Sequence, residues 1–271
     1  MARKVTIALV QSDTTLGDKR LNIEKGAILA KKAKEMGANI AVFPELFLTG
    51  YNLQQDYVKN AEQIDGPSIK EFCNIAKENN MYIQVGFVEE RRVPGVIYNS
   101  VAFLSPDGGI KGRYAKSHLF AKERLFFARG NDMPIFETEY GRFAPLICYD
   151  IGICELSRIY ALNGAECLLI SAAWCERDED LWDHNLIARS CDNLCFAAAC
   201  NRCGYERDSL HLIGKSKFMA PRGSVIKEAP CDEECVLTET IDLDEVSEAR
   251  QRCLYLLDRR PELYGDITVY S

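Results

Sequence analysis

The order of apolar and polar residues in the first half of the chain predicts strands that alternate with amphipathic helices. Short runs rich in Val, Ile, Phe and Tyr predict strands at residues 4–10, 38–45, 81–90, 97–104 and 110–116. Apolar residues at helical spacing among charges predict helices at residues 18–36 and 67–80. Ser68 and Glu71 form a Ser-x-x-Glu pattern, which predicts a capping box at the start of the second helix. The turn "SPDGG" between the last two strands predicts a hairpin.

The second half begins with the same alternation and then consists mostly of strands. An apolar run at residues 143–148 leads into a predicted helix at 155–163, which Gly164 is well placed to end. A buried strand at 166–174 and a helix at 181–192 follow. The remaining strands are predicted at residues 194–201, 212–221, 224–229 and 235–243. The whole pattern predicts a single α/β domain in which helices cover the surfaces of sheets.

The end of this domain, from about residue 250 to residue 271, has a different pattern. Its apolar and charged residues follow no clear period, as "RCLYLLDRRPELYGD" shows. We expect residues 250–271 to form a C-terminal tail that packs on a partner subunit.

The composition is typical of a globular protein that acts on small molecules. Of the 271 residues, 47% are hydrophobic and 27% are charged, which is enough for a substantial core. The net charge of -7, without any run of Lys or Arg, argues against nucleic acid and anionic lipid as partners. No apolar segment is long enough for a bilayer and no export signal is recognisable, so we expect a cytoplasmic protein. Its twelve cysteines are then expected to be reduced thiols.

Three reactive side chains stand at the ends of predicted apolar strands, each beside Pro or a polar turn. They are Glu45 in "AVFPELFLTGY", Lys116 in "GRYAKSHLF" and Cys148 in "LICYD". Ligand-facing groups of α/β sheets cluster at strand ends. Separate strands can therefore deliver these three residues to one pocket.

A carboxylate, an ammonium and a thiol are the groups that a thiol-dependent amide hydrolase needs. A free thiol with a pKa of about 8.5 is mostly protonated at neutral pH, so it requires a base or a cation nearby. Glu45 could accept the proton, and Lys116 could stabilise the oxyanion of the tetrahedral intermediate. The turn at Cys148 also offers backbone N–H groups at a helix start, including that of Tyr149, which favour negative charge.

The blocks around these residues resemble the carbon–nitrogen hydrolases of the nitrilase superfamily. The matching segments are "FPELFLTGY", "GRYAKSHLF" and "ICYD" with Glu155 about a turn later. The resemblance continues through "ARSCDNLCFAAACNRCG", "GKSKFMAPRG" and "RRPELY", so it covers nearly the whole chain. The chain departs from the family pattern at Ile153 and Cys154, where an aromatic residue and a proline usually precede the glutamate.

The resemblance implies a four-layer αββα sandwich, assembled as a homodimer or a larger homo-oligomer, without a metal or an organic cofactor. It also implies that Glu45 is the general base, Lys116 the electrostatic stabiliser and Cys148 the nucleophile. Glu123, in "HLFAKERLFFARGN", aligns with a second acidic residue that many members place near the nucleophile and the lysine.

Four further residues are candidates for contact with the substrate. Tyr51 and Asn52 follow Glu45 closely, and Trp174 ends the strand that follows the nucleophile helix. Trp174 could equally pack in the core. Arg177 could anchor a substrate carboxylate through a bidentate contact, although its acidic neighbours favour a surface ion pair.

The resemblance leaves three substrate classes open. A linear amide is our first expectation, because amide hydrolysis is the commonest activity that the resemblance implies. N-carbamoyl amines or amino acids come second, and nitriles come third.

A different class of protein also stays open, namely a non-catalytic binding protein or a zinc or thiol-redox protein. Cys200 and Cys203 form a Cys-x-x-Cys pair. A structural zinc site would need a second pair or histidines at matched spacing, and a redox motif would need a thioredoxin-like context. Cys154 could form a disulfide with Cys148 on oxidation, although core packing is the simpler role.

Overall fold

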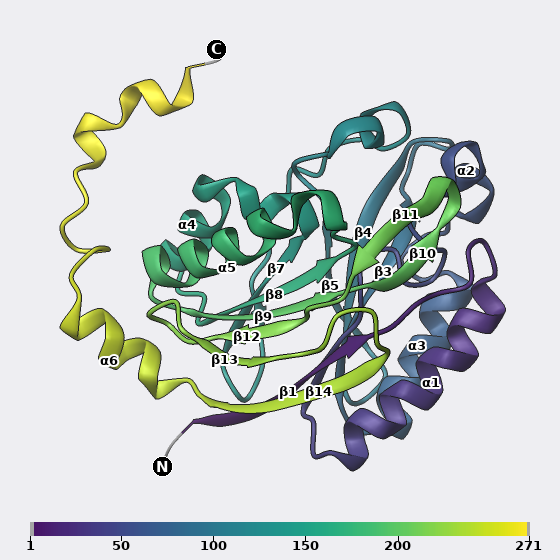
Figure 1. Ribbon diagram of the computed structural model, residues 1–271, viewed down its shortest axis with the longest axis horizontal. Helices are drawn as coiled ribbons and strands as arrows, with labels where there is room; N and C mark the ends of the chain where they lie inside the picture. The colour runs from purple at the N-terminus through teal and green to yellow at the C-terminus, as the bar shows by residue number, and fades with distance from the viewer. Residues whose placement is uncertain (1–2, 270–271) are drawn as a thin grey trace.

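Two mixed β-sheets form the centre of the protein (Figure 1). The structure is a computed structural model and describes residues 3–269. The first six-stranded sheet has the order β14 (Cys235–Asp242), β1 (Lys4–Gln11), β2 (Ile40–Val42), β3 (Tyr82–Glu90), β4 (Ile97–Leu104) and β5 (Ile110–Ala115). The second has the order β13 (Val225–Glu228), β12 (Lys217–Met219), β9 (Phe196–Asn201), β8 (Cys167–Ala172), β7 (Arg142–Ile147) and β6 (Phe136–Glu137).

The two sheets share one pattern of strand directions. The three strands β1, β2 and β3 are parallel, as are β7, β8 and β9. Antiparallel strands complete each sheet on both sides. Two short strands, β10 (Cys203–Glu206) and β11 (Leu210–Ile213), form a separate antiparallel pair.

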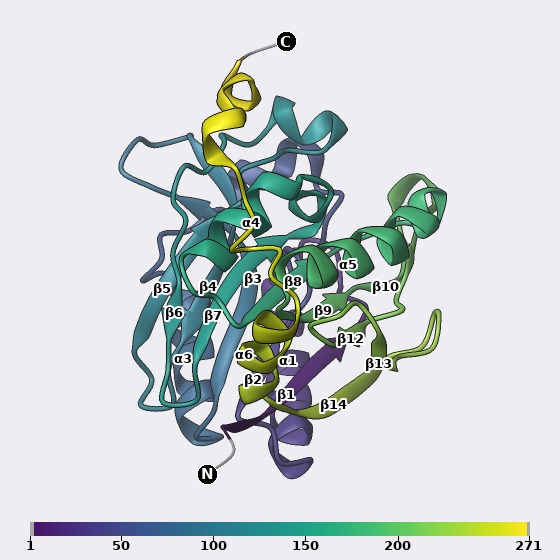
Figure 2. The same ribbon diagram turned by 90° about the vertical axis from the view of Figure 1, so that its left-hand side faces the viewer.

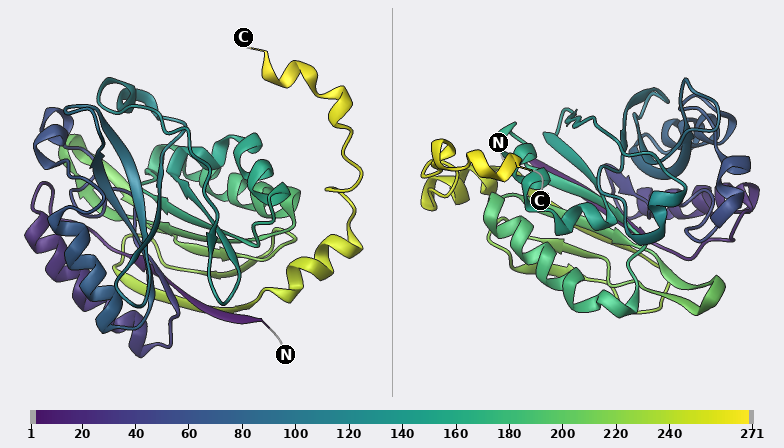
Figure 3. Two further views of the ribbon diagram at one scale, coloured as in Figure 1. Left: turned by 180° about the vertical axis from the view of Figure 1, so that it is seen from behind. Right: turned by 90° about the horizontal axis from the view of Figure 1, so that it is seen from above.

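Helices cover the outer face of each sheet, which gives four layers (Figure 3). The helices α1 (Lys19–Glu35) and α3 (Pro67–Glu78) pack on the first sheet, and α4 (Cys154–Leu162) and α5 (Glu179–Asn193) pack on the second. This arrangement confirms the predicted αββα sandwich. The remaining α-helices of the described chain are α2 (Tyr57–Asn60) and α6 (Asp244–Arg252). Within residues 3–269, no helix combines the length and the apolar character that crossing a membrane requires.

The central strands are buried on both faces, and their side chains alternate between two apolar layers. On β1, Val5, Ile7 and Leu9 pack between the two sheets, whereas Ala8 and Val10 pack under the helices. The alternation follows from the two-residue period of a strand. Because both faces are buried, these strands read as continuous apolar runs in the sequence.

The capping of α3 differs from the prediction, although the helix begins at Pro67 as predicted. Gly66 is the N-cap residue and Pro67 is the first helical residue, so Ser68 lies inside the helix. The Ser68 N–H donates to Glu62 Oε2 at 3.0 Å. The predicted capping box of Ser68 and Glu71 is therefore wrong, because a carboxylate from the preceding segment supplies the acceptor.

Other elements also differ from the sequence-based expectation. The predicted strand at residues 212–221 is divided into β11 and β12, because Gly214 and Lys215 have φ angles of 68° and 53°. Strand β10 was not predicted. Helix α6 was not predicted either, and residues 250–252, expected in the tail, belong to it.

Beyond α6 the chain leaves the body of the protein (Figures 1 and 2). Several large apolar side chains of this segment are exposed, among them Leu254, Leu257, Leu263, Ile267 and Val269. That this tail packs on a partner subunit remains a prediction.

Candidate active site

Glu45 lies on the loop that follows β2, and its side chain is fully buried. The next residue, Leu46, has a φ of 49°, in the left-handed region that non-glycine residues rarely adopt. A Cβ at Gly86 on β3 would lie 2.4 Å from the Leu46 nitrogen. The close approach of β3 to this loop therefore requires glycine.

Lys116 follows the last residue of β5 and is also fully buried. Strand β4 is antiparallel to both β3 and β5, so β5 runs in the same direction as β2. The loops that follow β2 and β5 therefore leave the same edge of the sheet. The Gly130 N–H donates to the Lys116 carbonyl at 2.9 Å, and a Cβ at Gly130 would lie 2.0 Å from the Ala115 oxygen.

Cys148 stands at the strand-to-helix turn that the sequence predicts. It follows β7 directly and is the first residue of a 3-10 helix, Cys148–Gly152. Its φ of 49° is a left-handed conformation, which costs of order 1 kcal/mol or more for a residue with a Cβ. Such strain persists only where the surroundings hold it.

Asp150 holds this turn. Its buried carboxylate accepts hydrogen bonds from the Ile147 N–H at 3.1 Å, the Tyr114 hydroxyl at 2.8 Å and the His118 N–H at 3.0 Å. Tyr114 and His118 flank Lys116 in the sequence, so Asp150 joins the Cys148 turn to the Lys116 loop.

The Lys116 ammonium connects two carboxylates. Its Nζ donates to Glu45 Oε1 at 2.7 Å and to Glu123 Oε1 at 2.8 Å. Asn99 Nδ2 donates to Glu45 Oε1 at 2.7 Å, and the Ala173 N–H donates to Glu45 Oε2 at 3.0 Å. All of these residues are buried. The interactions are therefore much less weakened by water and salt than those of a surface ion pair.

Glu123 lies on a short 3-10 helix, Ala121–Leu125, and is held from three directions. Besides Lys116, the Tyr51 hydroxyl donates to its Oε1 at 2.7 Å, and the Phe120 N–H donates to its Oε2 at 3.0 Å. The carboxylate thus fixes the second side of the ammonium.

The Cys148 thiol belongs to the same cluster. The charges of Glu45, Lys116 and Glu123 all act on this thiol. Burial raises the pKa of Cys148 well above its ordinary value, and Glu45 raises it further, whereas Lys116 lowers it. The resting thiol is therefore protonated at neutral pH and needs a base.

The pKa values of Glu45 and Lys116 are also shifted, in directions that suit proton transfer from Cys148. Burial raises the pKa of Glu45, although the attraction of Lys116 opposes that shift. Burial opposes the charge on Lys116, but Glu123 and Glu45 outweigh it and raise the pKa of Lys116 well above its ordinary value. Lys116 therefore stays cationic, and Glu45 is a better proton acceptor than an exposed carboxylate.

A cavity of about 310 Å³ opens beside Cys148. Its apolar wall is formed by Phe120, Ile153, Ala173, Trp174, Leu181 and Leu210. Polar side chains line it at Tyr51, Tyr149, Asp178 and Asn185. An outer cavity of about 730 Å³ shares part of this lining and carries more charged residues.

The predicted substrate contacts divide between the two cavities. Tyr51 and Trp174 line the inner cavity beside Cys148. Trp174 also packs on the Trp182 ring, with the ring centroids 5.6 Å apart, so it takes part in the core as well. Asn52 and Arg177 line only the outer cavity, and Arg177 is exposed there.

Tyr149, whose backbone N–H we expect to bind the oxyanion, is the second residue of the helix that starts at Cys148. N–H groups in the first turn of a helix have no acceptor within that helix. The Tyr149 ring lines the inner cavity and packs near Phe120, with ring centroids 5.3 Å apart.

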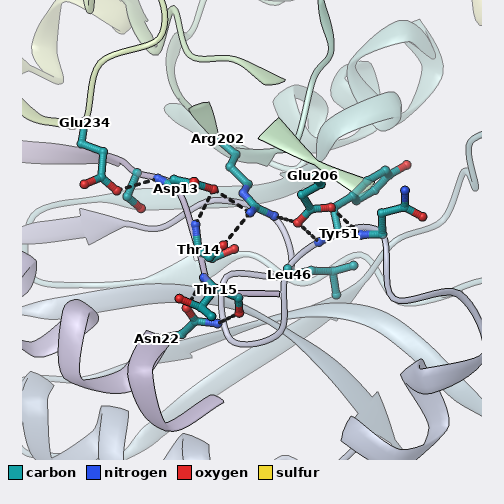
Figure 4. A network of polar contacts seen from close by, with 12 residues as sticks. Asp13, Thr14, Thr15, Asn22, Leu46, Tyr51, Arg202, Glu206 and Glu234 are labelled. Carbon is teal, nitrogen blue, oxygen red and sulfur yellow. Dashed lines mark hydrogen bonds and ion pairs between the residues drawn. The ribbon is translucent and has the colours of Figure 1, made fainter. Parts of the chain in front are cut away.

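A second buried network supports the Tyr51 loop (Figure 4). Glu206 Oε1 and Oε2 accept the N–H groups of Tyr51 at 2.8 Å and Asn52 at 2.6 Å. Glu206 also pairs with the buried guanidinium of Arg202, which donates to Asp13 Oδ1 at 2.8 Å. The network therefore continues from Arg202 through Tyr51 to Glu123.

Sequence reasoning gave no role to Asn99, Asp150 or Glu206. Asn99 could have been noticed as a polar residue within an apolar strand, and Asp150 as part of the "ICYD" block. Glu206 has no comparable signal, because its partners Tyr51 and Asn52 lie about 150 positions away in the chain.

The other cysteines do not form a metal site in the described part of the chain. All twelve thiols are free, and residues 3–269 contain no group of three or more potential metal ligands. Cys200 and Cys203 are buried, whereas Cys154 is exposed and donates to Glu155 Oε2 at 3.2 Å. Cys154 does not line the cavity beside Cys148.

Comparison with known proteins identifies the family. The family model described as carbon-nitrogen hydrolase matches residues 6–251, nearly the whole chain. The protein therefore belongs to the carbon–nitrogen hydrolases of the nitrilase superfamily, as the sequence motifs and the αββα sandwich indicated.

Individual relatives include amidases. A probable nitrilase of Schizosaccharomyces pombe is 36% identical over 266 residues, which cover 96% of this chain and 97% of that protein. The 2-oxoglutaramate amidase of Bacillus subtilis is 35% identical over 264 residues, covering 96% and 100%. An amidase mutant from Nesterenkonia sp. AN1, solved with the acetamide moiety of fluoroacetamide attached to its active-site cysteine, has a TM-score of 0.86 and 25% identity, covering 97% and 96%.

Proposed function

We propose that this protein hydrolyses a non-peptide carbon–nitrogen bond of a small molecule, with a linear amide as the favoured substrate, through a thioester on Cys148. The main support is the buried cluster in which the Lys116 ammonium lies 2.7 Å from Glu45 and 2.8 Å from Glu123. This cluster acts on the Cys148 thiol beside a cavity of suitable size for a small substrate. The amidases among the relatives support the same reaction class.

In the first half of the proposed reaction, Glu45 accepts the thiol proton as Cys148 attacks the carbonyl carbon. The Lys116 ammonium and the Tyr149 N–H stabilise the oxyanion of the tetrahedral intermediate. Glu45 then returns its proton to the leaving nitrogen as the carbon–nitrogen bond breaks. Ammonia or an amine leaves, and the acyl group remains on Cys148 as a thioester.

In the second half, Glu45 accepts a proton from water while the water oxygen attacks the thioester. The same two donors stabilise the second oxyanion. The intermediate collapses by releasing the carboxylic acid, and the proton on Glu45 returns to the Cys148 sulfur. Glu123 does not exchange a proton in this scheme, because its role is to hold Lys116 in position.

Two alternative substrates follow from the same three groups. Hydrolysis of N-carbamoyl amines or amino acids would pass through a carbamoyl thioester. Hydrolysis of a nitrile would pass through a thioimidate. Because the S. pombe relative is named a probable nitrilase, nitriles should be tested as substrates too. A zinc or thiol-redox function has no comparable support from the described residues.

The proposal extends to assembly and compartment. The exposed apolar side chains of the tail suit burial against a second copy of the chain, so the proposed working form is a homodimer or a larger homo-oligomer. The twelve free thiols suit a reducing compartment such as the cytoplasm.

Cys148→Ala tests the nucleophile, with Cys175→Ala as its matched control because Cys175 lines the same cavity. We expect Cys148→Ala to abolish hydrolysis across a panel of amides, carbamoyl compounds and nitriles while the protein stays folded. Cys175→Ala should retain turnover. Retained activity in folded Cys148→Ala would refute the proposed mechanism.

A further inference from the structure

We infer that the inner cavity selects amides with an uncharged, apolar acyl group and rejects amides whose acyl group ends in a carboxylate. This inference rests on the proposed function and names the substrate class of the same site. The B. subtilis relative is named for 2-oxoglutaramate, which carries a carboxylate at the end opposite its amide. The inferred substrate of this protein therefore differs from the one in the name of that relative.

The wall of the inner cavity is mostly apolar. Aromatic and aliphatic side chains form most of it, including Phe120, Trp174 and Leu210. An alkyl group placed against this wall leaves water, and each buried methylene improves binding by about fourfold. A carboxylate placed there would lose its hydration without a compensating partner.

The charged side chain that lines the inner cavity is acidic. None of the described residues that line the inner cavity is a lysine, arginine or histidine. The acidic side chain in its lining is Asp178, the N-cap residue of α5, and this side chain makes no capping hydrogen bond. A substrate carboxylate in the same small cavity would be repelled by Asp178.

The start of α5 does not reverse this sign. A helix N-terminus carries roughly half a positive charge. Here Asp178 is followed by Glu179 and Asp180 in the first helical turn. Glu179 pairs with Lys215, and the acidic side chains of this turn oppose the positive end of the helix dipole.

Cations do occur in the outer cavity, at Lys122, Arg177 and Arg207. All three are exposed, and none of them lines the inner cavity. Charges in such positions are screened by water and salt, so they attract anions in general without fixing a short carboxylate beside Cys148.

Gly152 offers a direct way to change the charge. It lines the inner cavity, and a Cβ built on it would have no heavy atom within 4 Å. Its φ does not lie in the left-handed region. A larger side chain can therefore be introduced here without backbone strain, and Gly152→Arg would add the cation that the wall lacks.

The test compares two amides of the same shape that differ in charge, 4-methylpentanamide and succinamate, in which a carboxylate replaces the isopropyl end. We expect kcat/KM of the wild-type protein to be higher for 4-methylpentanamide by at least about tenfold, which corresponds to about 1.4 kcal/mol. Asp178→Asn should raise kcat/KM for succinamate several-fold, and Gly152→Arg should raise it further. Neither substitution should improve hydrolysis of 4-methylpentanamide.

Asp180→Asn is the matched control, since Asp180 is an acid of the same helical turn that does not line the inner cavity. It should leave the ratio of the two substrates unchanged. Equal kcat/KM values for the two amides, or a preference for succinamate, would overturn the inference while leaving the proposed hydrolysis intact. Absence of turnover and of an acyl adduct with every amide would instead overturn the proposed function on which it rests.

Discussion

Lys116 has an unusual environment for a charged residue. It is fully buried and contacts two carboxylates, those of Glu45 and Glu123. Removing one member of a buried charge cluster leaves the others unpaired, which typically costs about 3–5 kcal/mol. The protein therefore keeps this cluster at a considerable cost in desolvation, as is typical of sites that perturb pKa values for chemistry.

The effect of Glu45 on the pKa of Cys148 predicts that Glu45→Gln increases thiol reactivity but decreases turnover. The Glu45 charge raises the pKa of Cys148, so its removal lowers that pKa and increases the thiolate fraction, by about tenfold per unit of pKa. Alkylation of Cys148 by iodoacetamide at about pH 8 should therefore become faster, whereas amide turnover should nearly disappear for lack of a proton acceptor.

Peptide mapping after timed alkylation measures the rate at Cys148 separately from the other thiols. Glu155→Gln is the control, because Glu155 lies near the turn but its charge is not among the main ones that shift the pKa of the thiol. Slower alkylation in Glu45→Gln would show that the carboxylate does not raise the pKa of Cys148.

The sequence was sufficient to choose Glu45, Lys116 and Cys148 as candidates, because each is a reactive group in a recognisable block. It could not show Asn99 or Asp150 as their partners. Their importance comes from hydrogen bonds across strands, such as that from Asn99 to Glu45 at 2.7 Å, which no local pattern encodes.

At the scale of elements, the candidate active site depends on several loops. Different strands hold these loops in place. The loop that carries Tyr51 is fixed by Glu206, which follows β9 and lies in the short pair β10 and β11. Arg202 holds Glu206 from the other side. Tyr51 then contacts Glu123, which contacts Lys116. We therefore propose Glu206 as a positioning residue rather than a catalytic one.

This chain of contacts predicts that Glu206→Gln and Tyr51→Phe act through the same pathway. Each should lower kcat by about tenfold with a smaller change in KM, because each loosens the carboxylate that orients Lys116. The double variant should lose less than the product of the two single losses, which a double-mutant cycle measures.

The control for Glu206→Gln is Asp183→Asn, which weakens another charge cluster, around Lys215 and Lys217. It should reduce stability without changing kcat. Independent, multiplicative effects of Glu206→Gln and Tyr51→Phe would show that Glu206 supports the fold but does not position Tyr51.

Local sequence patterns predict the buried strands and helices better than the elements that depend on distant contacts. Long strands such as β3 and β4 were predicted well, because burial on both faces makes most of their residues apolar. Helix α6 was missed, because it has only Val246 and Ala249 buried and is otherwise mostly charged. The cap of α3 was misassigned, because the acceptor at its start, Glu62, comes from outside the helix.

At the scale of the whole molecule, the tail is the feature that a single chain does not explain. Its apolar side chains are exposed while the segment stands off the body (Figure 1). Clusters of this kind usually mark an interaction surface. A second copy of the chain is the proposed partner.

Leu257→Glu should therefore weaken self-association, because Leu257 is 76% exposed in the single chain and would place a charge in the proposed interface. Sedimentation analysis should show a shift from dimer or larger species toward monomer. Val93→Glu is the control, since Val93 is also exposed, at 60%, but lies on a loop far from the tail in the sequence. An unchanged assembly in Leu257→Glu would mean that this part of the tail does not hold the subunits together.

The most direct test of the proposed chemistry is intact-protein mass spectrometry after rapid quenching of the reaction with the amide that is hydrolysed fastest. The buried Glu45, Lys116 and Cys148 cluster predicts one acyl group per chain, located on Cys148 by peptide mapping and absent from Cys148→Ala. Turnover without such an adduct, or an adduct on a different residue such as Cys175, would contradict it.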